Sequence, residues 1–306
     1  MTLPAYTKTP RLLMSPVLGW GLITLVAISL SLLLAGIFQR ELVNPGGVPQ
    51  LWRFVQASLR PSLSPEILAI AVSATLQTLA YAVCGTCFSL VIGCVGGLIC
   101  SEVWWEAVKR GGRRQRAEGS YGLRSVSGFY WMRVLLAVPR AIHELIWGLL
   151  FVNLWGTDPL TAVLAIAIPF GAITAKVFSE ILDETPRQPL QTLLNSGVSP
   201  LPAFCYSLLP QAFLNLVSYA FYRFECSIRS AAVLGIIGAG GLGYQIMLSL
   251  QSLRYEEVWT FIWALFVLNG CVDFASAWVR QRLGCASRLD LNVGQGEERR
   301  GQRAGG

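Results

Sequence analysis

The chain has 306 residues, of which 54% are hydrophobic and only 13% charged, and its net charge is +7. Soluble domains carry about 25% charged residues, so this composition excludes an ordinary soluble fold and indicates a membrane protein. The single histidine, His143, has no metal-ligand partner at helical spacing, and the sequence offers no paired carboxylates or nucleophile with a base. We therefore predict a non-enzymatic protein without a metal or cofactor site.

Six apolar segments are long enough to cross a bilayer, which needs roughly 20 helical residues. The first, at 17–38, has no charge, and the second, at 67–100, contains glycines suited to bending or close packing at positions 85, 93, 96 and 97. The other spans are expected near 131–155, 160–181, 212–237 and 258–279. The sequence thus predicts an all-α, polytopic membrane protein with six transmembrane helices.

Positive charges outside these spans are distributed unevenly, with fifteen on one side and four on the other. The larger group comprises Lys8, Arg11, the six cations from Lys109 to Arg124, Arg187, and the six arginines from Arg280 to Arg303. The positive-inside rule places this group in the cytoplasm, which predicts a multi-pass protein of the plasma or inner membrane with both termini cytoplasmic. We attribute the net positive charge to the orientation of the protein in the membrane and to contact with anionic lipid, and not to a nucleic-acid site.

Three regions follow from this pattern. Residues 1–66 are expected to form an anchor helix and an outer loop, in which Leu51, Trp52, Phe54 and Val55 suit an interfacial helix. Residues 67–283 form the membrane core, and the polar, glycine-rich tail at 284–306 is expected to be disordered.

The run "GAGGLG" at 238–243 has the G-x-G-x-x-G spacing of a dinucleotide-binding loop. Its flanks are apolar segments at membrane level, and no strand precedes it, so we expect a turn or a close helix approach near the outer face. None of the chain's three lysines lies in a Walker A motif. Any ATP-driven activity therefore requires a partner.

The loop between the fourth and fifth spans predicts a short helix, a glycine turn and a second short helix. Pro189 suits a first turn, Gly197 suits a helix stop, and Ser199 with Pro200 suits the next helix start. The first helix would present an apolar face of Leu190, Leu193 and Leu194 to the cytosol. Exposed apolar faces usually mark an interface.

This loop resembles the EAA loop of membrane subunits of binding-protein-dependent ABC importers. Gly197 and Pro210 fall at the family's spacing, whereas the Glu-Ala-Ala positions hold Gln191, Thr192 and Leu193. The resemblance implies a type I ABC importer permease fold with a cytoplasmic coupling helix that docks on an ATPase subunit. The implied coupling residues are Leu190, Gln191, Leu193, Leu194, Gly197 and Pro210.

Four further blocks, at 140–152, 175–189, 222–243 and 272–283, are similar to the phosphonate-type permeases of this superfamily. His143 stands where those permeases usually have proline. The resemblance implies import of a phosphonate, phosphite or related oxyanion by a homodimer that works with two ATPase subunits and an extracytoplasmic solute-binding protein. An ATPase-independent secondary transporter or channel is the alternative, and the sequence leaves open both the oxyanion and homodimer versus heterodimer.

Charges inside the membrane are costly and usually face a cavity or a partner. Arg140 with Glu144, and Glu225 with Arg229, have the i,i+4 spacing of helical ion pairs, which leaves Arg223 without a local partner. We expect Arg223 to contact the anion along the path. The alternative is that all five residues form a structural ion-pair network that holds the fifth span against the third.

Overall fold

The computed structural model describes residues 16–36, 46–113 and 122–283, and every regular element in these ranges is helical. The predicted disordered tail at 284–306 lies outside the described residues, as do the basic residues at 114–121. The chain divides into two compact units, Met1–Gln56 and Ala57–Gly306.

The first unit contains α1 (Pro16–Leu34) and nearly all of α2 (Val48–Ala57). The described apolar part of α1, Gly19–Leu34, is shorter than a membrane crossing requires, so the first span stays a prediction. The expected short amphipathic helix forms as α2, with Leu51 and Trp52 exposed. Its position at the lipid surface also stays a prediction.

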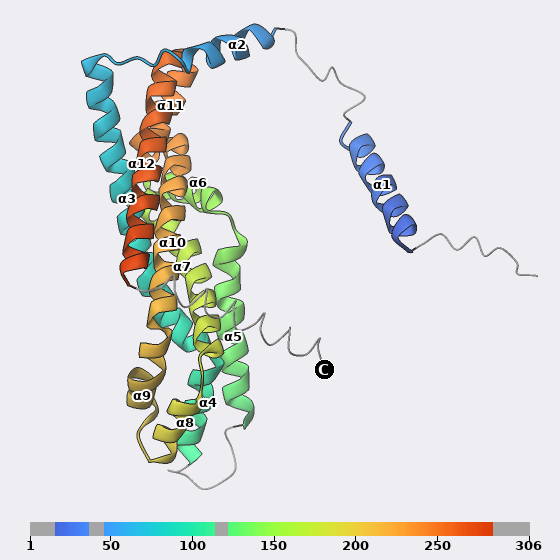
Figure 1. Ribbon diagram of the computed structural model, residues 1–306, viewed down its shortest axis with the longest axis vertical. Helices are drawn as coiled ribbons and strands as arrows, with labels where there is room; N and C mark the ends of the chain where they lie inside the picture. Colours follow the sequence, from blue (N-terminus) through green and yellow to red (C-terminus); the bar gives the residue numbers. More distant parts are fainter. Residues whose placement is uncertain (1–15, 37–45, 114–121, 284–306) are drawn as a thin grey trace, which may run out of the picture. The chain divides into compact units, whose positions relative to one another are not determined.

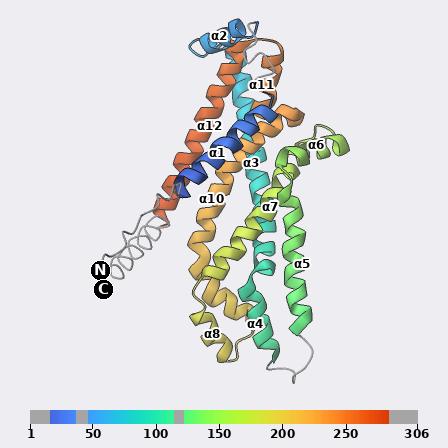
Figure 2. The same ribbon diagram turned by 90° about the vertical axis from the view of Figure 1, so that its right-hand side faces the viewer.

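The second unit is built around four long apolar helices, α3 (Pro65–Cys100), α7 (Pro159–Glu184), α10 (Leu209–Leu234) and α12 (Tyr255–Arg282). Figures 1 and 2 show these helices running roughly alongside one another. Within the described residues, four helices are long and apolar enough to cross a membrane, or five when a bent pair counts as one span. The second, fourth, fifth and last predicted spans are confirmed as apolar helices, while the total of six is not.

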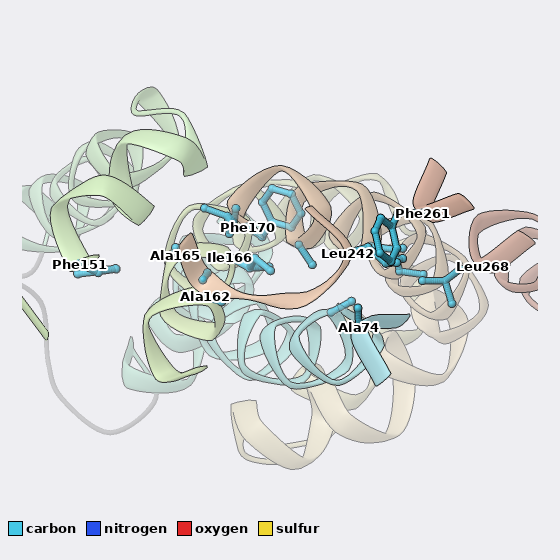
Figure 3. Close-up of a cluster of buried hydrophobic side chains, with 14 of the residues drawn as sticks. Ala74, Phe151, Ala162, Ala165, Ile166, Phe170, Leu242, Phe261 and Leu268 are labelled. Atoms are coloured by element: carbon cyan, nitrogen blue, oxygen red, sulfur yellow. The ribbon is translucent and has the colours of Figure 1, made fainter. Parts of the chain in front are cut away.

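Helices α3 and α7 pack closely because small residues of α3 lie against branched and aromatic residues of α7. A Cβ atom at Gly85 would lie 2.9 Å from Ile166, and one at Gly97 would lie 2.7 Å from the Cβ of Phe178. The prediction that the α3 glycines permit close helix packing is confirmed. The central apolar cluster of buried side chains includes Ile166 and Phe170 of α7, Ala74 of α3 and Phe261 of α12, all labelled in Figure 3.

The third predicted span is not one continuous helix but a bent pair of helices, which together are apolar enough to form one broken span. The chain forms α5 (Gly122–Ala141) and α6 (Glu144–Trp155), which are bent by 80° between Tyr130–Ala141 and Glu144–Trp155. His143 takes an extended conformation (φ −63°, ψ 144°), and its Nδ1 accepts a hydrogen bond from the Leu145 N–H at 3.2 Å. The imidazole therefore caps α6, a task usually performed by Ser, Thr, Asp or Asn.

The remaining elements gather at opposite ends of this unit. Helices α4 (Glu102–Arg113), α8 (Gln188–Asn195) and α9 (Pro200–Ala203) lie together at one end in both views, with the π-helical turn η2 (Phe204–Leu208) joining α9 to α10. Helix α11 (Gly241–Gln251) lies at the other end. The structure thus separates the loop with EAA spacing from the glycine-rich run.

The glycine-rich run forms a turn between two helices. After α10, the π-helical turn η3 (Gly235–Ala239) includes Gly238 at φ 102°, and Gly240 at φ 93° precedes α11. A Cβ atom at Gly243 would overlap the carbonyl oxygen of Ala232, so α11 approaches the end of α10 closely. The predicted turn and close approach are confirmed, and a helix stands where a dinucleotide-binding loop requires a strand.

Candidate coupling segment and intramembrane charges

The α8 segment ends as its sequence predicts. Gly197 has a φ of 95°, its N–H donates to the Leu194 carbonyl at 3.1 Å, and the Val198 N–H donates to the Leu193 carbonyl at 3.2 Å. These two bonds form a Schellman motif, which satisfies carbonyls that the helix end would leave unpaired. Gly197 is suited to this position because it has no Cβ to clash at positive φ.

The predicted exposure of the α8 apolar face is wrong. Leu190 is only 3% exposed and packs in a cluster with Leu182, Phe204 and Leu208, while Leu193 and Leu194 are partly buried against the same cluster. The face is buried because α4 and the α9 region fold back onto α8 and give it internal partners. Periodicity indicated an apolar face, but only the tertiary structure shows what covers it.

Other apolar side chains of the segment are exposed. Leu201 is 54% exposed and Tyr206 is 82% exposed, and both follow the Gly197 turn. The second helix of the prediction is not separate, because the helical run continues from α9 through η2 into α10. Pro210 explains the wider turn, since it cannot donate to the Tyr206 carbonyl and its ring would crowd that oxygen in a regular α-helix.

Helix α4 holds this end together, which the sequence interpretation missed. Asp183 near the end of α7 accepts hydrogen bonds from the Ser101 hydroxyl at 2.7 Å and from the Val103 N–H at 3.2 Å. Arg187, just before α8, pairs with Glu106 of α4 at 3.2 Å. The segment that follows α7 is therefore attached to a helix placed more than 80 residues earlier.

The predicted helical pair of Glu225 and Arg229 does not form. Glu225 pairs instead with Arg280 of α12 at 2.8 Å, and Arg229 is exposed, with no ion pair recorded among the described residues. The two side chains of the pair are 11% and 29% exposed. Arg280 lies just beyond the last predicted span at 258–279, so its pairing with Glu225 depends on the three-dimensional packing.

We expect the Glu225–Arg280 pair to contribute measurably to stability. Each single change, Glu225→Gln or Arg280→Gln, should lower the thermal unfolding midpoint because it leaves a largely buried charge unpaired. The double variant should recover part of the loss, with a coupling energy of about 0.5–3 kcal/mol in a double-mutant cycle. Strictly additive losses would show that the two residues act independently.

Arg140 and Glu144 also do not pair, because the break at His143 places them on different helices. Glu144 accepts a hydrogen bond from the Ser230 hydroxyl of α10 at 2.9 Å and lies 3.5 Å from the His143 Nε2. Arg140 has no ion pair among the described residues. The proposed five-residue ion-pair network is therefore not what holds α10 against α5 and α6.

The break itself gives a testable result. His143→Ala should lose the side-chain cap of α6 and about 1 kcal/mol of stability. His143→Pro should tolerate the break, because a φ of −63° is the value that a proline ring imposes. Thermal unfolding midpoints of the two purified variants check this order, and a proline variant less stable than the alanine variant would contradict it.

Arg223 is a buried charge that forms no ion pair with any of the described residues. It is 7% exposed, its Nε and Nη2 have no hydrogen-bond partner among the described residues, and its Cζ lies 4.0 Å from the centroid of the Phe170 ring. The sequence-based expectation that Arg223 lacks a local partner is confirmed within the described part of the chain. Its contact with an anion stays a prediction.

The chain matches the family model "binding-protein-dependent transport system inner membrane component" over residues 123–284, which is more than half of its 306 residues. The chain belongs to this family. The match includes the bent α5–α6 pair, α8 with its glycine turn, α10 and α12. A permease subunit of this family is a membrane component, consistent with the apolar helices described above.

Relatives in this family include phosphite and phosphate permeases. PtxC, the permease protein of a phosphite transport system of Stutzerimonas stutzeri, is 32% identical over 49% of this chain and 54% of its own length. The putative phosphite permease HtxC of the same organism is 27% identical over 76% of each chain. The phosphate-import permease PhnE of Mycolicibacterium smegmatis is 30% identical over 54% of this chain and 32% of its own.

The chain thus spans about half of PtxC and about three quarters of HtxC. These relatives confirm the resemblance to the phosphonate-type permeases.

Two solved structures of ABC transporters have a similar fold. A chain of the inward-facing methionine ABC transporter MetNI has a TM-score of 0.57 at 19% identity, covering 72% of this chain and 99% of that one. A chain of an amino acid ABC transporter crystallised with histidines has a TM-score of 0.55 at 17% identity, covering 71% and 95%. At such identities the likeness establishes the ABC importer permease fold alone.

Proposed function

We propose that the chain is the membrane subunit of an ATP-driven importer that translocates a phosphonate, phosphite or related oxyanion delivered by a solute-binding protein. The observation that carries this proposal is the family match together with the phosphite and phosphate permeases among its relatives. Family membership favours the importer over an ATPase-independent transporter or channel. The subunit itself would hydrolyse no ATP, because its lysines lie outside any Walker A motif.

The coupling contact would involve the end of the molecule that carries α8. Its exposed apolar residues Val198, Leu201 and Tyr206 offer a patch for a cytoplasmic ATPase subunit. In this proposal Leu190, Leu193 and Leu194 support the patch from inside, and Gly197 shapes the turn that presents it. Gln191 and Pro210, which the EAA resemblance also implicates, flank the same surface in sequence.

The assembled importer would contain two permease chains, either a homodimer or this chain with a second permease. The positive-inside charge pattern supports an orientation with α8 in the cytoplasm and the binding protein at the opposite face. Mass measurement of the purified complex in detergent, with and without a co-expressed second permease, distinguishes the two stoichiometries.

The decisive experiment is ATP hydrolysis by the complete complex in proteoliposomes. The permease, its ATPase and its binding protein would be assayed with methylphosphonate, aminoethylphosphonate, phosphite and phosphate. Stimulation by one of these anions is the expected result and would identify the substrate. An ATPase that binds the permease but responds to none of them would refute the oxyanion assignment, and an ATPase that does not bind would refute the importer.

A further inference from the structure

The buried guanidinium of Arg223 has two unpaired donors along one edge. Nε and Nη2, the nitrogens without a partner among the described residues, lie side by side on the guanidinium plane. This edge can donate two parallel hydrogen bonds to two oxygens of a single carboxylate or phosphate group. The unpaired atoms therefore have the geometry of a two-oxygen anion site.

Neighbouring groups fix where this edge points. The Phe170 ring of α7, only 5% exposed, covers one face of the guanidinium at 4.0 Å. Figure 3 places Phe170 within the buried apolar cluster. The Ser227 hydroxyl donates to the Arg223 carbonyl at 2.9 Å and contacts the Thr86 hydroxyl of α3 at 2.8 Å. The backbone and the charged group of Arg223 are both held, so the edge is oriented before any ligand arrives.

The charge of Arg223 is uncompensated in this conformation. None of the ion pairs in the described part of the chain includes Arg223. The acid nearest in sequence, Glu225, is held by Arg280, and Glu180 of α7 pairs with Lys176 at 3.4 Å. An arginine stays charged at any physiological pH, and a buried charge without a partner costs several kcal/mol. Such a cost is typical of a functional position.

We propose that the Nε–Nη2 edge of Arg223 contacts the translocated anion, and that Phe170 is a positioning residue for it. The ligand would be a tetrahedral phosphorus oxyanion with at least two free oxygens, which rests on the function proposed above. Both donors are inaccessible to solvent here, so the contact forms in a transport state that opens this edge of the guanidinium while Phe170 stays on its face. Glu225, the acid nearest in sequence, is already paired with Arg280.

The test compares uptake of phosphite and methylphosphonate by proteoliposomes that contain the complete complex. Arg223→Gln should reduce uptake per assembled complex at least tenfold. Arg223→Lys keeps the charge but loses the two parallel donors, so its uptake should lie between those of Arg223→Gln and the native chain. Phe170→Leu should also reduce uptake while leaving the guanidinium present. Arg282→Gln, which removes an exposed cation at the end of α12, is the matched control and should transport normally.

Unfolding midpoints and the yield of assembled complex separate transport from stability. If Arg223→Gln lowers stability while uptake per assembled complex stays native, the residue is structural and the proposal is overturned. If Arg223→Gln does not assemble, Arg223→Lys and Phe170→Leu decide, and native uptake by both would equally overturn it. Failure of the native complex to respond to any oxyanion refutes the proposed function instead, so the two outcomes are distinguishable.

Discussion

Gly243→Ala should strongly destabilise the protein, whereas Gly270→Ala should not. The new Cβ would overlap the carbonyl oxygen of Ala232, a backbone atom that cannot rotate away, and Gly235 lies on the same contact. Adding atoms to a closely packed site costs typically 1–3 kcal/mol, and we expect about 3 kcal/mol because the obstacle is backbone. The thermal unfolding midpoint of the purified permease and its yield from membranes measure the effect.

Gly270→Ala is the matched control. Gly270 lies in α12, and a Cβ atom there would meet nothing within 4 Å. Alanine is favoured over glycine inside a helix, so this variant should be unchanged or stabilised by up to about 1 kcal/mol. Equal stability of the two variants would show that α10 and α11 are not packed as the structure has them.

Changes at the exposed residues of the coupling segment should separate docking from folding. The double change Leu201→Ser with Tyr206→Ser should leave the free energy of unfolding within about 0.5 kcal/mol of the native value, because both side chains are exposed. It should weaken binding of the ATPase subunit at least tenfold, since tyrosine is among the residues that contribute most of the binding energy at protein interfaces. Titration of the ATPase into the permease in nanodiscs measures the affinity.

Leu190→Ala should instead lower the stability of the fold. Leu190 is 3% exposed in the cluster with Phe204 and Leu208, so its truncation should cost about 2–5 kcal/mol of folding free energy.

For the docking prediction, Leu59→Ser is the control for loss of surface hydrophobicity, because Leu59 is 85% exposed near the start of α3. Native ATPase affinity in the Leu201/Tyr206 variant would place the docking surface elsewhere.

In the loop after α7, local sequence patterns predicted the ends of the helices but not which side chains are buried. Pro189 and Gly197 predicted the helix and its stop, and Ser199 with Pro200 predicted the following start, because capping and proline placement depend on a few neighbouring residues. The same pattern could not tell whether Leu190 faces solvent or other helices. That depended on α4, which arrives from a segment more than 80 residues earlier in the chain.

The charged residues show the same division. Helical spacing suggested Glu225 with Arg229 and Arg140 with Glu144, since residues four apart are neighbours on one continuous helix. The first pairing failed because α12 brings Arg280 to Glu225, and the second because the chain breaks at His143. The prediction that Arg223 lacks a local partner is confirmed among the described residues, whereas its contact with the Phe170 ring could not be predicted from helical spacing.

By itself, the sequence determined the membrane class, the long apolar helices, the glycine turns and the family, because hydrophobic length, proline and glycine chemistry and motif spacing are local properties. The tertiary structure alone decided which charges pair, which side of α8 is buried and which donors of Arg223 stay unpaired. Those features depend on contacts between residues far apart in the chain, such as Thr86 with Ser227 and Glu225 with Arg280. No periodicity within one segment encodes such contacts.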